Sequence, residues 1–405
     1  MSVKYTNFVE VNINRHISST ASDLRNTACA IFYNASLVGN DTQDFGKLTK
    51  TSTVPAALSD FEDYINAFFR NGGQLLHCIA TKIAPSVTTG VAPDPVVTIA
   101  NSAFTAIIKT LPMEEIMVGF AIKKTETTYG ESDFRLVAEA YNTAHATEKI
   151  YQKIFVSEIK PNPTGATPST AGTIADLADY KSGDAKVVDQ ENYVLKYGAL
   201  GIGASVLAYY TQINIYATDS TEDYCYTKEK YDEDTSSTTY NFVFDDNEFV
   251  KLAMQLDINV DINLSNSVRV IGGNDTAGLS LTNQYMLLVM HQTLTTRLIE
   301  LLTTKIKYNA QGLSLVLNTL TTELNKYVAN GFLSTNRTWT EGDLYYNNYL
   351  VVSDNTLLNL GYKVVILPFE SLNPEEIKAH QLPKVYILAA DTYSIRKIVV
   401  NGELF

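Results

Sequence analysis

The clearest pattern of apolar and polar positions in this chain lies between Val54 and Thr81. Its apolar residues are spaced three, four, three and one apart, as on one face of an α-helix: Leu58, Phe61, Ile65, Phe68 and Phe69. Asn71, Gly72 and Gly73 predict a stop, because glycine adopts the left-handed cap conformation without a Cβ clash. An apolar run from Leu75 to Ala80 then has the length of a buried strand.

A second apolar run, Ala28–Tyr33, precedes this helix. The order strand, helix, strand predicts a right-handed βαβ unit with parallel strands. The same alternation continues, with predicted strands at 116–122 and 151–156 and predicted helices at 99–111, 134–145 and 197–210. We therefore expect an α/β fold (α+β overall), with a mainly parallel sheet flanked by helices.

In the second half of the chain, the spacing of apolar and polar residues differs from that in the first half. Residues 219–241 are acidic and polar, as in a solvated loop. Two long amphipathic helices follow, the first with the stripe Leu287, Met290, Leu294, Leu298 and Leu301. The second spans Gln311–Asn330, with Asn309 as its predicted cap. The last part is β-rich, with predicted strands at Tyr345–Val352, Val364–Leu367 and Val385–Ala389.

These patterns suggest four parts. Residues 1–15 form an N-terminal arm, and residues 16–215 form an α/β domain. Residues 216–335 contain the acidic excursion and the long helices. Residues 336–405 form a β-rich part with a terminal arm, and we expect this part to pack with the N-terminal βαβ unit.

The first residues alternate as a strand does, with one face formed by Val3, Tyr5, Val9, Val11 and Ile13. A strand at a chain end either pairs within its own chain or adds to the sheet edge of a neighbour. The alternation alone favours pairing within the chain.

Composition limits the classes of partner. The chain has 405 residues, 45% of them hydrophobic, and a formal net charge of −13. An acidic chain without a dense basic run is a poor nucleic-acid or anionic-membrane binder. The first residues lack the apolar segment of a signal peptide. The longest uncharged stretch, 197–218, contains too short an apolar part for a membrane span, so we expect a soluble protein made in a cytoplasm.

No motif in the sequence predicts catalysis, a metal or a cofactor. Three separated cysteines argue against a disulfide scaffold and a zinc site: Cys29, Cys78 and Cys225. No pair of histidines has helical ligand spacing: His16, His77, His145, His291 and His380. The glycines of GALGIG, Gly198, Gly201 and Gly203, depart from the dinucleotide order and fall inside a predicted helix, where close packing explains them better. A split site stays possible in principle, but we expect no enzyme.

Several segments resemble one family. AFFRNGG followed by a buried strand resembles a segment near the N-terminus of contractile phage tail sheath proteins. VRVIGG before a long helix, KIKYNAQGLSLVLNTLTTELNKYVANGFL, and the β-rich ending are similar to the C-terminal half of sheath-like proteins. SIRKIVVNGELF resembles the closing strand of a more divergent sheath-like group. These similarities are short and scattered over residues 20–81 and 266–405.

The resemblance implies a structural subunit of the virion, without a cofactor. Its partners would be further copies in stacked hexameric rings, the tail tube protein, and baseplate and tail terminator proteins. Contraction of the rings would drive the tube into the host. The chain ends would add strands to neighbouring subunits, which reverses the preference stated above. The implied arm residues are Val3, Tyr5, Val9, Val11 and Ile13, with Ile395, Ile398, Val400, Leu404 and Phe405. The implied core motif is Phe68, Phe69, Asn71, Gly72 and Gly73.

Two alternatives belong to other classes. One is another tail component, such as a tube or baseplate protein, although tube proteins are usually smaller and β-barrel-like. The other is an α/β ligand-binding protein or enzyme. Such a protein would have a pocket with convergent polar groups at the carboxyl ends of its strands.

Overall fold

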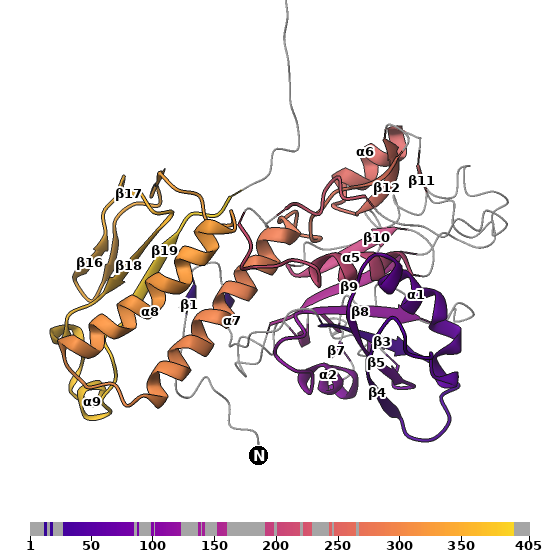
Figure 1. The fold of residues 1–405 in the computed structure, drawn as a ribbon, viewed down its shortest axis with the longest axis horizontal. Coiled ribbons are helices and arrows are strands. Elements are labelled where there is room, and N and C mark those ends of the chain that lie inside the picture. Colours follow the sequence, from indigo (N-terminus) through magenta and orange to yellow (C-terminus); the bar gives the residue numbers. More distant parts are fainter. Residues whose placement is uncertain are drawn as a thin grey trace, which may run out of the picture. The chain divides into compact units, whose positions relative to one another are not determined.

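The computed structural model describes residues 12–13, 17–18, 27–84, 87–88, 99–100, 102–122, 137–138, 140–141, 152–159, 191–197, 201–218, 222–228, 243–244, 247–264 and 267–392. The chain divides into two compact units, whose elements can be followed in Figure 1. The sheet unit contains Ser18–Ile213 and Tyr224–Leu288. The C-terminal unit contains Met1–Ile17, Asn214–Asp223 and Val289–Phe405. A mixed sheet with parallel strands, together with helices and small antiparallel sheets, confirms the predicted α/β class.

The sheet unit is built on a six-stranded sheet with the order β10-β9-β8-β3-β5-β4. Its strands are β3 (Thr27–Tyr33), β4 (Thr42–Leu48), β5 (Leu75–Thr81), β8 (Met117–Ile122), β9 (Ile154–Ile159) and β10 (Tyr193–Tyr197). β3 lies between β5 and β8 and is parallel to both, as the predicted βαβ unit requires. β4 is antiparallel to β5 and forms one edge of the sheet.

The helix between β3 and β5 ends as its sequence predicts. A 3-10 turn, η2 (Ala56–Phe61), leads into α1 (Glu62–Arg70). Gly73 N donates to Phe68 O at 3.0 Å and Gly72 N donates to Phe69 O at 3.2 Å, which is a Schellman cap. Gly72 has φ +92°, and a Cβ at Gly73 would lie 2.3 Å from the ring of Phe68. The two glycines are thus required by backbone conformation and by packing, respectively.

Helices cover both faces of this sheet. On one face, α2 (Ser102–Lys109) contributes Phe104 to a buried cluster with Ile31 and Phe120. On the other face, the Phe32 ring packs against η2 and α1, with its centroid 4.7 Å from that of Phe61 and 5.6 Å from that of Tyr64. The helix α5 (Ile202–Tyr210) packs beside α1 and over β8 and β9. Both faces are therefore buried, which explains why the strands are continuous apolar runs.

Residues after 223 contribute a second sheet and a helix to the sheet unit. A three-stranded sheet consists of β11 (Val243–Phe244), β12 (Val260–Leu264) and β13 (Ser267–Ile271), and α6 (Asn247–Gln255) precedes β12. Asn259 N donates to Leu195 O and Tyr197 N donates to Asn259 O, both at 3.0 Å. The start of β12 therefore continues the ladder at the β10 edge. A further short pair is formed by β6 (Val87–Thr88) and β7 (Ile99–Ala100).

The helix predicted at 197–210 is confirmed over Ile202–Tyr210, but its predicted start is wrong. β10 ends at Tyr197, and α5 begins only at Ile202. Nearly every described residue of this stretch is buried, so its side chains show no polar face from which a period can be recognised. The tertiary structure, rather than periodicity, decides where the strand stops.

The single strand predicted at Tyr345–Val352 is also wrong. This stretch is a hairpin of β15 (Leu344–Tyr346) and β16 (Tyr349–Val352). Asn347 and Asn348 form its turn with φ values of 45° and 67°. Two consecutive positive φ values fit a type I′ turn, a conformation that asparagine tolerates.

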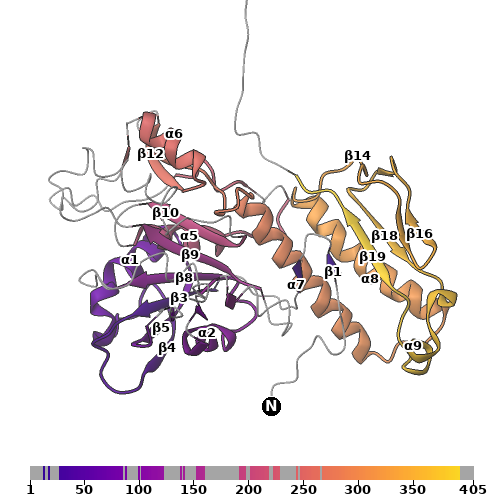
Figure 2. The same ribbon diagram turned by 180° about the vertical axis from the view of Figure 1, so that it is seen from behind.

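The C-terminal unit combines long helices with small sheets. α7 (Leu281–Thr303) begins in the sheet unit and ends in this one, and α8 (Ala310–Ala329) follows. The small sheets are β14 (Arg337–Thr338) with β17 (Leu357–Leu358), β15 with β16, and β18 (Tyr362–Ile366) with β19 (Val385–Ala389). α8 runs across β18 and β19 in both ribbon views (Figures 1 and 2). The side chain of Asn309 accepts from Gly312 N at 3.1 Å, which confirms the predicted cap.

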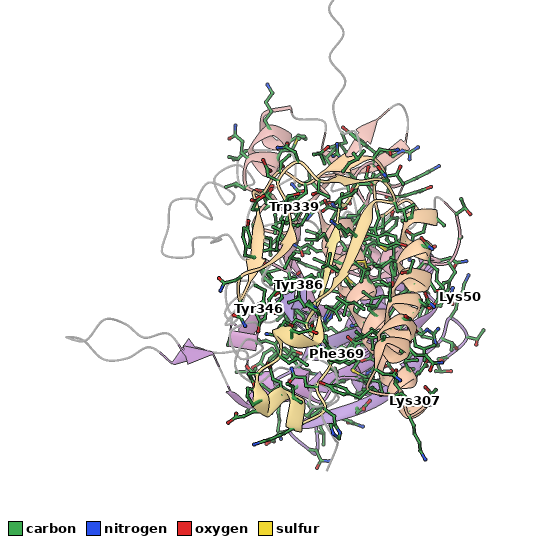
Figure 3. All side chains as sticks on the ribbon, turned by 90° about the vertical axis from the view of Figure 1, so that its left-hand side faces the viewer. Lys50, Lys307, Trp339, Tyr346, Phe369 and Tyr386 are labelled. Atoms are coloured by element: carbon green, nitrogen blue, oxygen red, sulfur yellow. The ribbon has the colours of Figure 1, made fainter. Side chains whose placement is uncertain are left out.

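Short elements close this unit. After β18, η3 (Phe369–Ser371) and α9 (Pro374–Lys378) precede β19. Asn373 and Glu376 form a reciprocal capping box at the start of α9. Tyr346 and Tyr386 lie near one another, as labelled in Figure 3, with ring centroids 6.2 Å apart. The predicted packing of residues 336–405 on the N-terminal βαβ unit stays a prediction.

Candidate functional site

A buried polar cluster lies toward the amino ends of β3, β5 and β8. Cys29 and His77 are register partners in adjacent parallel strands, so their side chains share a face of the sheet. Glu115 comes from the turn before β8 and is fully buried. Its Oε2 lies 2.8 Å from His77 Nδ1, and the other ring nitrogen, Nε2, lies 3.0 Å from Asp44 Oδ1. The ring of His77 therefore connects a buried carboxylate with one on the edge strand.

An irregularity in β4 places Asp44 on this ring. The register of β4 against β5 shifts between Asp44 and Lys47. Gly46 has φ +70°, and its N–H donates to Asp44 Oδ1 at 2.7 Å. Such a bulge redirects a side chain and interrupts the regular edge of a sheet.

The cluster changes the proton affinities of its members. Burial alone would lower the pKa of His77, but hydrogen bonds and charges of Glu115, and then of Asp44, outweigh it and raise that pKa. Burial lowers the pKa of the Lys153 ammonium to about 8. Burial, reinforced by the charge of Glu115, holds the pKa of the Cys29 thiol well above its usual range. Cys29 is therefore a neutral thiol, unsuited to act as a nucleophile.

Cys29, His77 and Glu115 offer ligand atoms within 4.8 Å of one another, so we tested them as a metal site. Two ligands of a tetrahedral zinc lie about 3.3 Å apart, given metal bonds of about 2.0–2.1 Å. The His77–Glu115 contact of 2.8 Å is shorter and suits a shared proton. Lys153 Nζ also donates to Glu115 O at 2.8 Å, and Lys47 Nζ lies 3.7 Å from Glu115 Oε1. With two ammonium groups already present, the cluster does not fit a divalent cation.

The carboxyl ends of the strands are where α/β sheets ordinarily bind ligands. Here the first turn of α5 follows β10 and contains glycines of the GALGIG segment. The segment therefore joins a strand to a helix, contrary to its predicted place within a helix. Gly201 N and Gly203 N both donate to Glu158 Oε1 at 2.8 Å. The buried carboxylate of Glu158 occupies the amides that would hold a phosphate in a dinucleotide fold, and it would repel that anion.

A second buried charge pair joins β10 to β12. Lys196 Nζ lies 3.2 Å from Asp261 Oδ1, and both side chains are 0% exposed. The ammonium also donates to Ser205 Oγ at 3.1 Å and to the Tyr224 hydroxyl at 2.9 Å. Sequence reasoning missed this pair, although a lysine in the otherwise uncharged run before Tyr197 was a signal. Because both charges are compensated inside the protein, we assign the pair a structural role.

The sequence-predicted residues fall into three groups. Phe68, Phe69, Asn71, Gly72 and Gly73 form the end of α1 and its cap. Among the predicted arm residues, Ile13 lies in β1 (Asn12–Ile13), which pairs with β2 (Ile17–Ser18). The other arm residues lie outside the described ones: Val3, Tyr5, Val9, Val11, Ile395, Ile398, Val400, Leu404 and Phe405.

Among the described cysteines and histidines, Cys29 and His77 come together in the buried polar cluster. Cys29, Cys78 and Cys225 are all buried free thiols. His77 belongs to the polar cluster, His291 is buried on α7, and the ring of His380 lies 5.7 Å from that of Tyr308. His16 and His145 lie outside the described residues.

The small sheets of the C-terminal unit form a different kind of candidate site. Within the described residues, β18 and β19 hydrogen-bond only to each other as strands, so each has a second edge without a neighbour. On the hairpin, Tyr345 and Leu350 are register partners and are 57% and 50% exposed. Leu357 and Leu360 are also exposed. Unpaired strand edges and exposed apolar side chains are features of surfaces that other chains cover.

Comparison with protein-family models found no match to this chain, and comparison with curated proteins found none either. Among the described segments, no helix has both the length and the apolar character that crossing a bilayer requires.

Proposed function

We propose that this chain is a structural subunit of a contractile phage tail sheath. It polymerises around the tail tube, in stacked hexameric rings, through strands that its terminal arms add to neighbouring copies. Its partners are then its own copies, the tail tube protein, and the baseplate and tail terminator proteins. The place of action is the virion, after assembly in the host cytoplasm. In this role the chain is not an enzyme and needs no cofactor.

The observation that carries the proposal is the FFRNGG segment with the parts of the chain that resemble the same family. The segment forms an aromatic helix, a Schellman cap and a buried parallel strand, as the resemblance implies. The second region of resemblance contains α7, α8 and the small sheets. The local structure of these two regions supports the proposal.

The C-terminal unit supports strand addition. Directly after β19, the chain pairs with residues 332–334, since Ser334 N donates to Ala390 O and Thr392 N donates to Phe332 O. Beside it, β18 and β19 keep free edges among the described residues. An added strand gains main-chain hydrogen bonds along such an edge, while the bodies that it links can still rotate.

The test is assembly of the full chain and of arm variants, followed by electron microscopy. We expect wide hollow cylinders from the full chain, and folded but unassembled protein after deletion of residues 1–13 or 394–405. Val9→Asp with Val11→Asp places charges on the predicted apolar face and should also block assembly. Glu10→Lys, on the opposite face, is the matched control and should assemble. Normal cylinders from the truncated chains would contradict the arm role, and thin tubes from the full chain would favour a tube protein.

A further inference from the structure

Besides its backbone pairing with β5, the edge strand β4 is joined to the interior of the sheet unit by a chain of three side chains. Asp44 on β4, His77 on β5 and Glu115 before β8 are joined by contacts of 3.0 and 2.8 Å through the two ring nitrogens of His77. A carboxylate only accepts, so both contacts are hydrogen bonds only when both nitrogens carry a proton. The observed geometry is therefore that of an imidazolium between two carboxylates.

Other titratable groups surround this ring from each packed element. β3 contributes the neutral thiol of Cys29, and Lys153 lies just before β9. Lys47 on β4 lies 3.7 Å from Glu115 Oε1 and 3.8 Å from Glu114 Oε1. Glu115 thus has the Lys47 side chain as a second partner whatever the state of His77. Asp44, by contrast, has the ring and Gly46 N as its described partners.

We propose that Asp44, His77 and Glu115 form a proton-operated clamp on β4, in which loss of one ring proton opens the contact between Asp44 and His77. The proton that remains stays on Nδ1, because Glu115 is fully buried and needs a donor. The Asp44 side chain is 63% exposed and can turn to water instead. Two lone pairs then face one another across the former contact, and they repel.

The direction of the pH effect follows from the His77 pKa. The folded protein raises this pKa above its ordinary value of about 6.5, despite the opposing effect of burial. The stabilisation is therefore complete below about pH 6.5 and is lost as the pH rises through the raised value. The clamp is closed in mild acid and opens toward alkaline pH.

Opening has a consequence for association. β4 covers the outer edge of β5, whose residues Leu75–Thr81 are almost entirely buried. If β4 detaches, β5 becomes an apolar edge strand able to accept another strand. This inference is independent of the proposed sheath role.

Hydrogen exchange of the intact chain tests the clamp, with rates divided by the intrinsic rate at each pH. Between about pH 6 and pH 9 we expect residues 42–48 to lose protection about ten-fold, because a charge-assisted hydrogen bond is lost. Residues 117–122 of β8 should keep theirs. In Asp44→Asn the amide can accept from a protonated Nε2 or donate to a bare one, so the pH dependence of β4 should disappear. His380→Gln, which removes a histidine of the other unit, should behave as the wild type.

A wild-type chain whose β4 protection shows no pH dependence would overturn the clamp. Equal losses in β4 and β8 would overturn it too, since they indicate loosening of the whole sheet unit. Persistence of the β4 effect in Asp44→Asn would assign it to another group.

Discussion

The two units of this protein bury their β-strands in opposite ways. In the sheet unit, six strands form one continuous sheet, and helices cover both of its faces. In the described part of the C-terminal unit, the strands from β14 to β19 form three separate two-stranded sheets beside α8. A lone two-stranded sheet is marginally stable in water, so these pairs depend on the helix and on whatever adds to their edges. Among the described residues, β18 and β19 each therefore keep an edge without a neighbouring strand.

One charge cluster from each unit shows a contrast in burial. Lys196 and Asp261 of the sheet unit are wholly removed from water. In the C-terminal unit, Glu323 is nearly buried but its partners, Arg297 and Lys326, remain 28% and 35% exposed. A buried ion pair is sensitive to loss of one member, while partly exposed pairs are screened and contribute little. Substitutions that remove one charge from each cluster test this contrast.

The largest effect is expected from removing one charge of the buried pair. Lys196→Met should destabilise the protein by about 3–5 kcal/mol, because Asp261 would remain charged and buried. Arg297→Met is the matched change in the C-terminal unit and should lower stability by about 1 kcal/mol or less, since Lys326 stays with Glu323. Chemical denaturation measures both values. In the double variant Lys196→Met/Asp261→Leu much of the loss should be recovered, and a loss equal to the single variant would contradict this account.

A smaller effect compares the same truncation in a strand of each unit. Leu76 on β5 is 0% exposed, whereas Leu350 on β16 is 50% exposed. Leu76→Ala should therefore lower the free energy of unfolding by about 2–5 kcal/mol, through lost burial and a cavity. Leu350→Ala should change it by about 0.5 kcal/mol or less. Similar losses in both, measured by denaturation of unassembled protein, would show that the hairpin is better buried than its exposure indicates.

The smallest effect concerns the contact between α8 and β18. The Tyr362 hydroxyl donates to Asn325 Oδ1 at 2.7 Å. Tyr362→Phe should destabilise the protein by about 0.5–1.5 kcal/mol, the usual net value of one hydrogen bond. Tyr345→Phe, which alters an exposed tyrosine of the hairpin, is the control and should have no measurable effect on the denaturation midpoint. An equal change of midpoint in both variants would show that this hydrogen bond does not stabilise the packing of β18 on α8.

Sequence reasoning succeeded where the signal is local. The stripe of α1, its Asn-Gly-Gly cap and the Asn309 cap of α8 were all predicted, because each depends on residues within a few positions of one another. It misplaced the start of the helix predicted at 197–210 and missed the turn within 345–352. At 197–210 nearly all described residues are buried, so no polar face marks where the helix begins. At 345–352 two asparagines form a turn that interrupts the predicted strand.

The candidate sites lay mostly beyond such reasoning. Glu115 reaches His77 from 38 positions away along the chain, and Glu158 reaches Gly201 from 43. Neither carboxylate stands out in an acidic chain. Only a resemblance to known proteins suggested the terminal arms, and most of their residues lie outside the described part of the structure.

By itself, the sequence determined the α/β class, the βαβ unit and the long helices, since hydrophobic period and capping residues act over single turns. The tertiary structure decided that residues 224–288 belong with the sheet unit, and that β4 ends that sheet. The tertiary structure also brings the Glu158 carboxylate to the backbone amides at the start of α5, and the Asp44 carboxylate to the ring of His77. Hydrogen bonds between distant segments depend on strand order and register, and no local pattern specifies either.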